Sequence, residues 1–144
     1  MKPRHFIAQL DRKRLEAAIA AAETKTSGEI RVLIHRRPGD DAVAFAQKEF
    51  LRLGMQKTRE RNAVLLFVAP ASQAFALIGD EGVHLKCGQA FWAEVAAVMQ
   101  ENFRAGDFTG ALLEGIARAG QLLAAHFPPG PEGTNELPNQ VVEQ

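Results

Sequence analysis

Apolar residues recur at intervals of three and four in four stretches of the chain, which is the spacing of an amphipathic helix packed against a core. The predicted helices cover about residues 11–25, 41–53, 89–103 and 108–123. Asp11 precedes the first, and Asp40 or Asp41 precedes the second, where an aspartate can accept hydrogen bonds from free backbone N–H groups. Gly54 ends the second helix.

Three shorter runs, 29–35, 63–69 and 73–78, are rich in aliphatic residues and predict β-strands. The run 63–69 shows no alternation of polar and apolar residues, which is typical of a strand buried on both faces between helices. Only residues 70–72 separate the second and third runs, too few for a parallel crossover, so these two strands should pair antiparallel. The pattern therefore predicts an α/β fold with a mixed sheet.

Prolines and glycines dominate the chain beyond Phe127, and few apolar residues accompany them. Such a composition does not support a packed structure. We expect an α/β domain at residues 1–127 and a disordered tail at residues 128–144.

Composition excludes several classes of protein. A chain of 144 residues with 47% hydrophobic residues forms one ordinary domain. Its formal net charge of +0 provides no electrostatic attraction to nucleic acid, and Cys87, the only cysteine, cannot form an internal disulfide. The N-terminus reaches charged residues too early for a signal peptide, and no apolar run approaches the ~20 residues of a membrane helix. We expect a soluble, cytoplasmic protein without a transmembrane segment.

Several motifs occur in an order that resembles the TPM domain family, over roughly residues 10 to 127. They are Thr26-Ser27-Gly28-Glu29-Ile30 before the first strand, Arg61-Asn62-Ala63-Val64-Leu65-Leu66 at the second, Gly79-Asp80-Glu81-Gly82 after the third, the Trp92 helix, the turn at 102–107 and His126-Phe127-Pro128. The resemblance implies a three-layer α/β/α sandwich with a small mixed sheet and about four helices, in a short, stand-alone bacterial member.

The same resemblance implies several activities. Some plant members are described as acid phosphatases, some members are taken to bind calcium, and others modulate membrane complexes without known catalysis. We therefore expect a protein partner, such as a membrane-associated complex, and a divalent cation such as calcium, but no nucleotide, organic cofactor or nucleic acid.

Glu29 stands at the start of the first strand, and Asp80 and Glu81 follow the third. Ligands of α/β sheets gather beyond strand ends, and carboxylate oxygens suit a hard cation. These three residues are the predicted metal ligands. Their mutual repulsion predicts that calcium raises the melting temperature and that Asp80→Asn leaves the metal-free protein equally or slightly more stable. The alternative is that Glu29 pairs with an arginine and that Asp80 and Glu81 form a solvated turn.

Arg61 and Asn62 precede the buried strand, where an arginine can hold a phosphate or carboxylate at two points. With His84, an acid or base candidate beside Asp80, they form the predicted ligand or partner site. The alternative is a charged surface loop and a surface histidine.

No catalytic residue is predicted, because the sequence contains neither a Cys-x5-Arg loop nor other known phosphatase signatures. The leading hypothesis is a binding or accessory module. A metal-assisted acid phosphatase is the alternative, in which Arg61 would steady the phosphate.

Overall fold

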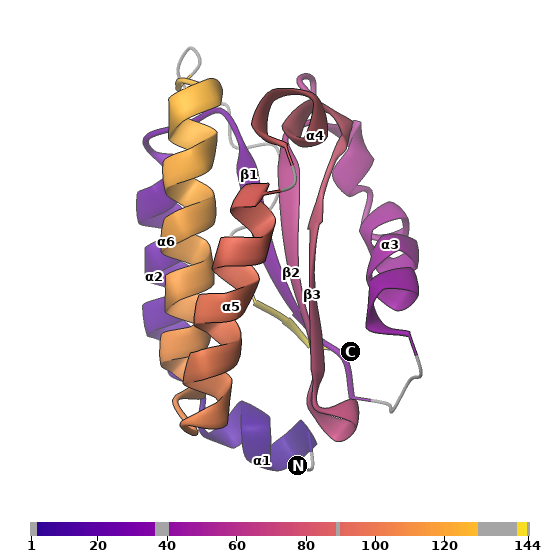
Figure 1. The fold of residues 1–144 in the computed structure, drawn as a ribbon, viewed down its shortest axis with the longest axis vertical. Coiled ribbons are helices and arrows are strands. Elements are labelled where there is room, and N and C mark those ends of the chain that lie inside the picture. Colours follow the sequence, from indigo (N-terminus) through magenta and orange to yellow (C-terminus); the bar gives the residue numbers. More distant parts are fainter. Residues whose placement is uncertain (1–2, 37–40, 89, 130–140, 144) are drawn as a thin grey trace.

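Four strands form one mixed sheet in the computed structural model, which describes residues 3–36, 41–88, 90–129 and 141–143 (Figure 1). They are β1 Glu29–Ile34, β2 Ala63–Ala69, β3 Ala74–Gly79 and β4 Val141–Glu143. Their order across the sheet is β3-β2-β1-β4. The central strand β1 is parallel to both β2 and β4, whereas β2 and β3 are antiparallel, as their short connection predicted.

Six α-helices are found in the described part of the chain. They are α1 Pro3–Ala8, α2 Arg12–Glu23, α3 Ala42–Arg52, α4 Glu81–Cys87, α5 Ala90–Arg104 and α6 Phe108–His126. The four predicted helices correspond to α2, α3, α5 and α6. The side chains of Asp11, Asp41 and Asp107 accept hydrogen bonds from backbone N–H groups at three helix starts. The short helices α1 and α4 were not predicted, because six or seven residues show too little periodicity.

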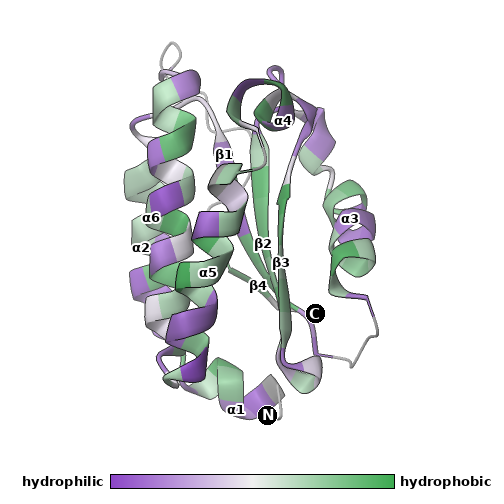
Figure 2. Cartoon of the chain, in the orientation of Figure 1, coloured by the Kyte–Doolittle hydropathy of each residue, from purple (hydrophilic) through white to green (hydrophobic). Residues whose placement is uncertain are grey.

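The sheet separates two layers of helices. The helices α2, α5 and α6 cover one face, and α3 covers the other (Figure 1). Every residue of β2 is buried, which confirms the interpretation of its continuous apolar run, and the strands are the most hydrophobic layer in Figure 2. Alternate residues of β1 divide between the cores, with Val32 on the α2 side and Leu33 on the α3 side. The predicted three-layer α/β/α sandwich is confirmed.

The prediction of a disordered tail is wrong at its end. Val141–Glu143 form β4 beside β1, and the Val141 side chain is buried in the core on the α2 side. Two residues of α2 also hold Val141 by its backbone: Arg12 donates to its carbonyl oxygen at 2.8 Å, and Glu16 accepts from its N–H at 3.2 Å. Residues 130–140 of the predicted tail lie outside the described residues.

No helix within the described ranges is both long enough and apolar enough to cross a membrane.

Candidate functional site

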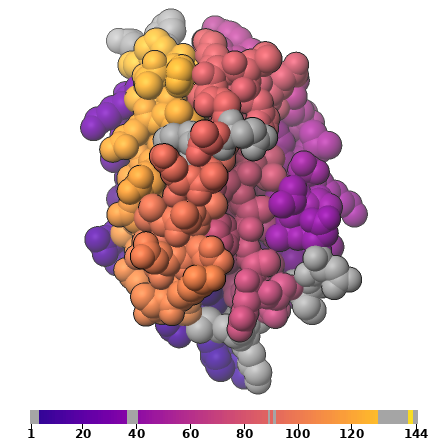
Figure 3. Space-filling model, viewed as in Figure 1, coloured from indigo at the N-terminus to yellow at the C-terminus, as the bar shows by residue number. Residues whose placement is uncertain are grey.

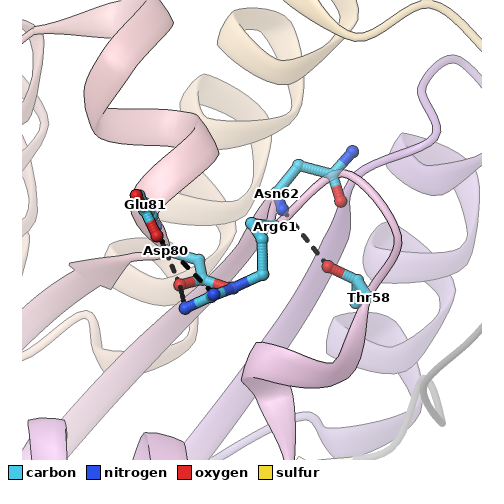
Figure 4. Close-up of polar contacts among 5 residues, drawn as sticks. All are labelled: Thr58, Arg61, Asn62, Asp80 and Glu81. Atoms are coloured by element: carbon cyan, nitrogen blue, oxygen red, sulfur yellow. Dashed lines mark hydrogen bonds and ion pairs between the residues drawn. The ribbon is translucent and has the colours of Figure 1, made fainter.

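Arg61 and Asp80 form a two-point ion pair at the ends of β2 and β3 (Figure 4). Arg61 Nε lies 2.7 Å from Asp80 Oδ2, and Nη2 lies 2.9 Å from Oδ1. The third nitrogen, Nη1, lies 3.6 Å from Glu81 Oε2. The hydrogen bond to Asp80 and its negative charge raise the pKa of Arg61 above its usual value. The guanidinium therefore lies between Asp80 and Glu81, two of the three carboxylates that the sequence assigned to a metal ion.

Asp80 fixes the start of α4 as well as the side chain of Arg61. Its carboxylate is 5% exposed, and Oδ1 accepts a hydrogen bond from the N–H of Glu81 at 2.8 Å. The N–H of Gly82 donates to the carbonyl oxygen of Arg61 at 2.8 Å. A Cβ at Gly82 would collide with the backbone oxygens of Glu60 and Arg61, so only glycine allows this approach. The predicted turn at 79–82 is therefore the start of a helix bound to the loop before β2.

Asn62 is buried and connects that loop to the segment before β1. Its N–H donates to Thr58 Oγ1 at 3.2 Å, and its side-chain Nδ2 donates to Ser27 Oγ at 3.1 Å and to Glu60 Oε2 at 3.3 Å. Ser27 Oγ in turn donates to Glu60 Oε2 at 3.0 Å. Asn62 is thus a structural residue of the loops, and its amide does not face an open site.

Glu29 lies apart from Asp80 and Glu81. Glu29 pairs in register with Ala63 of β2, and the carbonyl oxygen of Ala63 accepts the N–H of Asp80. The strand β2 therefore lies between Glu29 and Asp80, which are separated by two strand spacings, ~10 Å. The Glu29 side chain is buried and interacts with Glu23 and Arg31. The sequence's alternative interpretation, in which Glu29 pairs with an arginine, agrees with this arrangement.

A cluster of two buried residues, Glu29 and Arg31, and the half-buried Glu23 lies at the edge of β1 that β4 leaves uncovered. Glu23 Oε2 accepts the N–H of Ile30 at 2.7 Å and takes the place of a neighbouring strand there. Burial is the main cause that raises the pKa of Glu23 from 4.5 to about 8, and the Glu29 charge adds to it. Burial thus favours the protonated form of Glu23 over the charged one.

The predicted metal ligands do not fit a cation site. No group of three or more histidine, cysteine, aspartate or glutamate side chains within the described ranges is arranged to hold a metal ion. Glu29 belongs to a different cluster, and a cation between Asp80 and Glu81 would have to displace the Arg61 guanidinium. Divalent cation binding stays a hypothesis that this geometry does not favour.

His84 lies on the exposed side of α4, and only its backbone N–H contacts Asp80, by a hydrogen bond to the carbonyl oxygen. Its side chain lines a cavity of about 410 Å³ together with Asp80. The structure thus places Arg61, Asp80, Glu81 and His84 on one surface, with Asn62 beneath it and Glu29 elsewhere.

Sequence reasoning missed several residues that build this site. Ser27 lay in a quoted motif and Glu60 did not, but neither was assigned a role, because polar residues in loops are common. Gly82 lay in a quoted motif, but its role depends on a close backbone approach that only folding creates. Thr26 donates from Oγ1 to the carbonyl oxygen of Phe127 and ties the end of α6 to the start of β1.

Comparison with known proteins identifies similar chains. The family model of the TPM domain matches residues 1–122. The NMR structure of the BA42 protein from the psychrophilic bacterium Bizionia argentinensis is 34% identical, with a TM-score of 0.86 over 92% of each chain. The N-terminal domain of a protein from P. gingivalis is 16% identical, with a TM-score of 0.60 over 80% of this chain and 74% of that one, a likeness of fold alone. No curated protein matches.

Proposed function

This chain belongs to the TPM domain family, and from that premise we propose that it is a binding or accessory module that recognises a partner protein at its strand ends. The supporting observation is that the charged side chains there, those of Arg61, Asp80 and Glu81, form ion pairs with one another. Arg61 and Asp80 hold two loops together, and the outer side of the same cluster, with Glu81 and His84, is exposed. Such a surface is suited to contact with a protein rather than to chemistry on a small substrate.

The alternative, a metal-assisted acid phosphatase, receives no support from this geometry. A phosphate approaching Arg61 would meet the carboxylates of Asp80 and Glu81 beside the guanidinium, and the three side chains together carry a net negative charge. Repulsion between these carboxylates and a phosphate opposes binding unless a cation intervenes. The role of Arg61 as a phosphate ligand stays an untested prediction.

A phosphatase assay separates the two functions. Purified protein would be incubated with p-nitrophenyl phosphate, with and without calcium or magnesium, and compared with the Asp80→Asn variant. We expect no turnover above that of buffer in either protein. Metal-dependent turnover that disappears in Asp80→Asn would refute the binding-module proposal.

A crosslinking experiment tests the surface itself. A photoreactive amino acid at position 84, in cells that naturally express the chain, should give a discrete protein adduct. The same group at Lys13, which is exposed on α2, is the control and should give none. Identical adduct patterns at the two positions would contradict a partner site at the strand ends. A partner from a membrane-associated complex remains our prediction for the adduct.

A further inference from the structure

The strand β3 forms one edge of the sheet, and its outer backbone groups have no strand partner in the described part of the chain. The N–H of Asp80 donates to the carbonyl oxygen of Ala63, which fixes the alternation of the antiparallel ladder. By that alternation, Phe75, Leu77 and Gly79 direct their N–H and C=O groups away from β2. The edge therefore offers a row of donors and acceptors to another extended chain.

This edge lacks the charges, prolines and bulges that protect many edge strands of natural sheets. The strand Ala74–Gly79 contains no charged residue and no proline, and it pairs regularly with β2 along its whole length. Natural proteins place lysine, proline or a bulge at such edges to prevent pairing with other chains. A regular, uncharged edge favours strand addition.

The edge lies in a groove between helices (Figure 3). At Leu77–Gly79 the 410 Å³ cavity has Val43, Gln47 and Leu51 of α3 on one wall, with His84 and Trp92 on the other. The side chains of Val43 and Leu51 are 51% and 59% exposed, so both apolar side chains of this wall are in contact with water. An apolar residue of a bound segment would remove them from water.

A second cavity, of about 580 Å³, meets the edge at Ala74 and Phe75. Its apolar lining includes Phe6, Phe75, Phe103 and Phe108, so it is suited to an aromatic or large aliphatic side chain. Arg104 is the one charged residue in this lining, it is exposed, and it has no ion-pair partner in the described ranges. A carboxylate on the bound segment would complement it.

We propose that an extended segment of a partner protein binds this groove as an additional strand on the edge of β3. The segment alternates apolar and polar residues, places a large apolar side chain in the cavity beside Phe75, and carries an acidic residue next to Arg104. This inference rests on the proposed function as a binding module and specifies the partner's conformation and chemistry. A second copy of this chain fits less well, because its own edge strand Ala74–Gly79 contains no acidic residue to complement Arg104.

Selection from a displayed library of short random peptides tests the inference on the full chain. We expect enriched peptides to alternate apolar and polar residues and to contain Asp or Glu. Amide hydrogen exchange then locates them: bound peptide should slow exchange at Phe75, Leu77 and Gly79. The amides of Ala76 and Ile78 already point toward β2, so they serve as internal controls and should change little.

Three variants on the surface sharpen the test. Leu51→Lys, on the groove wall, should weaken binding about tenfold or more, and Arg104→Glu should change the selected preference from acidic to basic residues. Lys13→Glu, on the far helix α2, should bind as the wild type does. All three positions are exposed, so the variants should fold.

Two outcomes would overturn the inference: no enriched peptide, or peptides that protect other amides and are insensitive to Leu51→Lys. Slow exchange at Phe75, Leu77 and Gly79 in the free protein, together with a concentration-dependent mass, would show that a second copy covers the edge. The phosphatase assay is independent of the groove. Turnover would refute the proposed function, whereas failed peptide binding without turnover would refute only the strand-addition inference.

Discussion

Arg61 and Asp80, 19 residues apart in the sequence, face each other through two hydrogen bonds of 2.7 and 2.9 Å. One partner, Asp80, is almost completely buried, and the other is 44% exposed. An ion pair of this kind stabilises the junction between β2 and α4, because removing one charge leaves the other without its partner. It also reverses one expectation from the sequence, which treated Asp80 as a carboxylate repelled by its neighbours.

Asp80→Asn should therefore destabilise the protein. An asparagine can still cap α4, but it no longer neutralises Arg61. Because Arg61 is partly exposed and screened, we expect a loss of about 1–2 kcal/mol and a melting temperature lower by roughly 3–6 °C. Thermal unfolding followed by circular dichroism measures this loss. The control is Asp107→Asn, at an exposed N-cap without an ion pair in the described ranges, and equal losses in both variants would show that the pair contributes nothing.

Calcium should change the melting temperature of the wild type by less than about 1 °C at millimolar concentration, because the Arg61 guanidinium already lies between Asp80 and Glu81, where a cation would bind. In Arg61→Ala the two carboxylates lose that cation, so any calcium-dependent increase should be larger. A large increase in the wild type that Asp80→Asn abolishes would instead restore the cation site predicted from the sequence. Differential scanning fluorimetry with calcium, and with magnesium for comparison, measures both effects.

Glu23→Gln should change how stability depends on pH. The folded state holds a proton on Glu23 with a pKa of about 8, against an ordinary value of 4.5. The stability from this proton is fully present below about pH 4.5 and is lost as the pH rises through about 8. Glutamine cannot ionise and still accepts the N–H of Ile30. As the pH rises, the free energy of unfolding of the variant should therefore increase relative to that of the wild type. The increase should be about 1–2 kcal/mol near pH 8.5 after allowance for screening.

Urea unfolding at several pH values measures that difference. The matched control is Glu101→Gln, because Glu101 is an exposed carboxylate on α5 without a side-chain partner in the described part of the chain. Its difference from the wild type should stay nearly constant over the same range. A constant difference for Glu23→Gln as well would mean that Glu23 is ionised in the folded protein at neutral pH.

Val141→Ala should destabilise the protein although it lies three residues from the C-terminus. Its side chain is 2% exposed within the core on the α2 side. Removing two buried carbon atoms should cost about 1–2 kcal/mol. The control is Val142→Ala, at a half-buried position on the opposite face of the sheet, where we expect a smaller loss. If Val141→Ala has no effect on thermal unfolding, β4 does not contribute to stability in solution.

Elements with a local signal could be predicted from the amino-acid pattern. The run of Ala63–Ala69 predicted a strand buried on both faces, and the three residues after it allowed only an antiparallel return. Helical spacing identified α2, α3, α5 and α6, because each presents an apolar face over several turns. These predictions succeeded since side-chain spacing and connection length constrain the backbone directly.

Contacts between residues that are distant in the sequence depend on how the whole chain folds. Glu29 and Asp80 both stand near strand ends, but β2 lies between them, and the side chain of Glu29 joins Glu23 and Arg31 instead. Val141–Glu143 form β4 because Val141 pairs with β1 and is bound by Arg12 of α2. The strand β1 and the helix α2 come together only in the folded protein. Strand register and side-chain direction set such contacts, and a shift of one residue would turn each side chain to the opposite face. Local sequence patterns do not specify that register. For this reason Arg61 and Asp80 could be identified as candidate site residues from the sequence, but their ion pair could not.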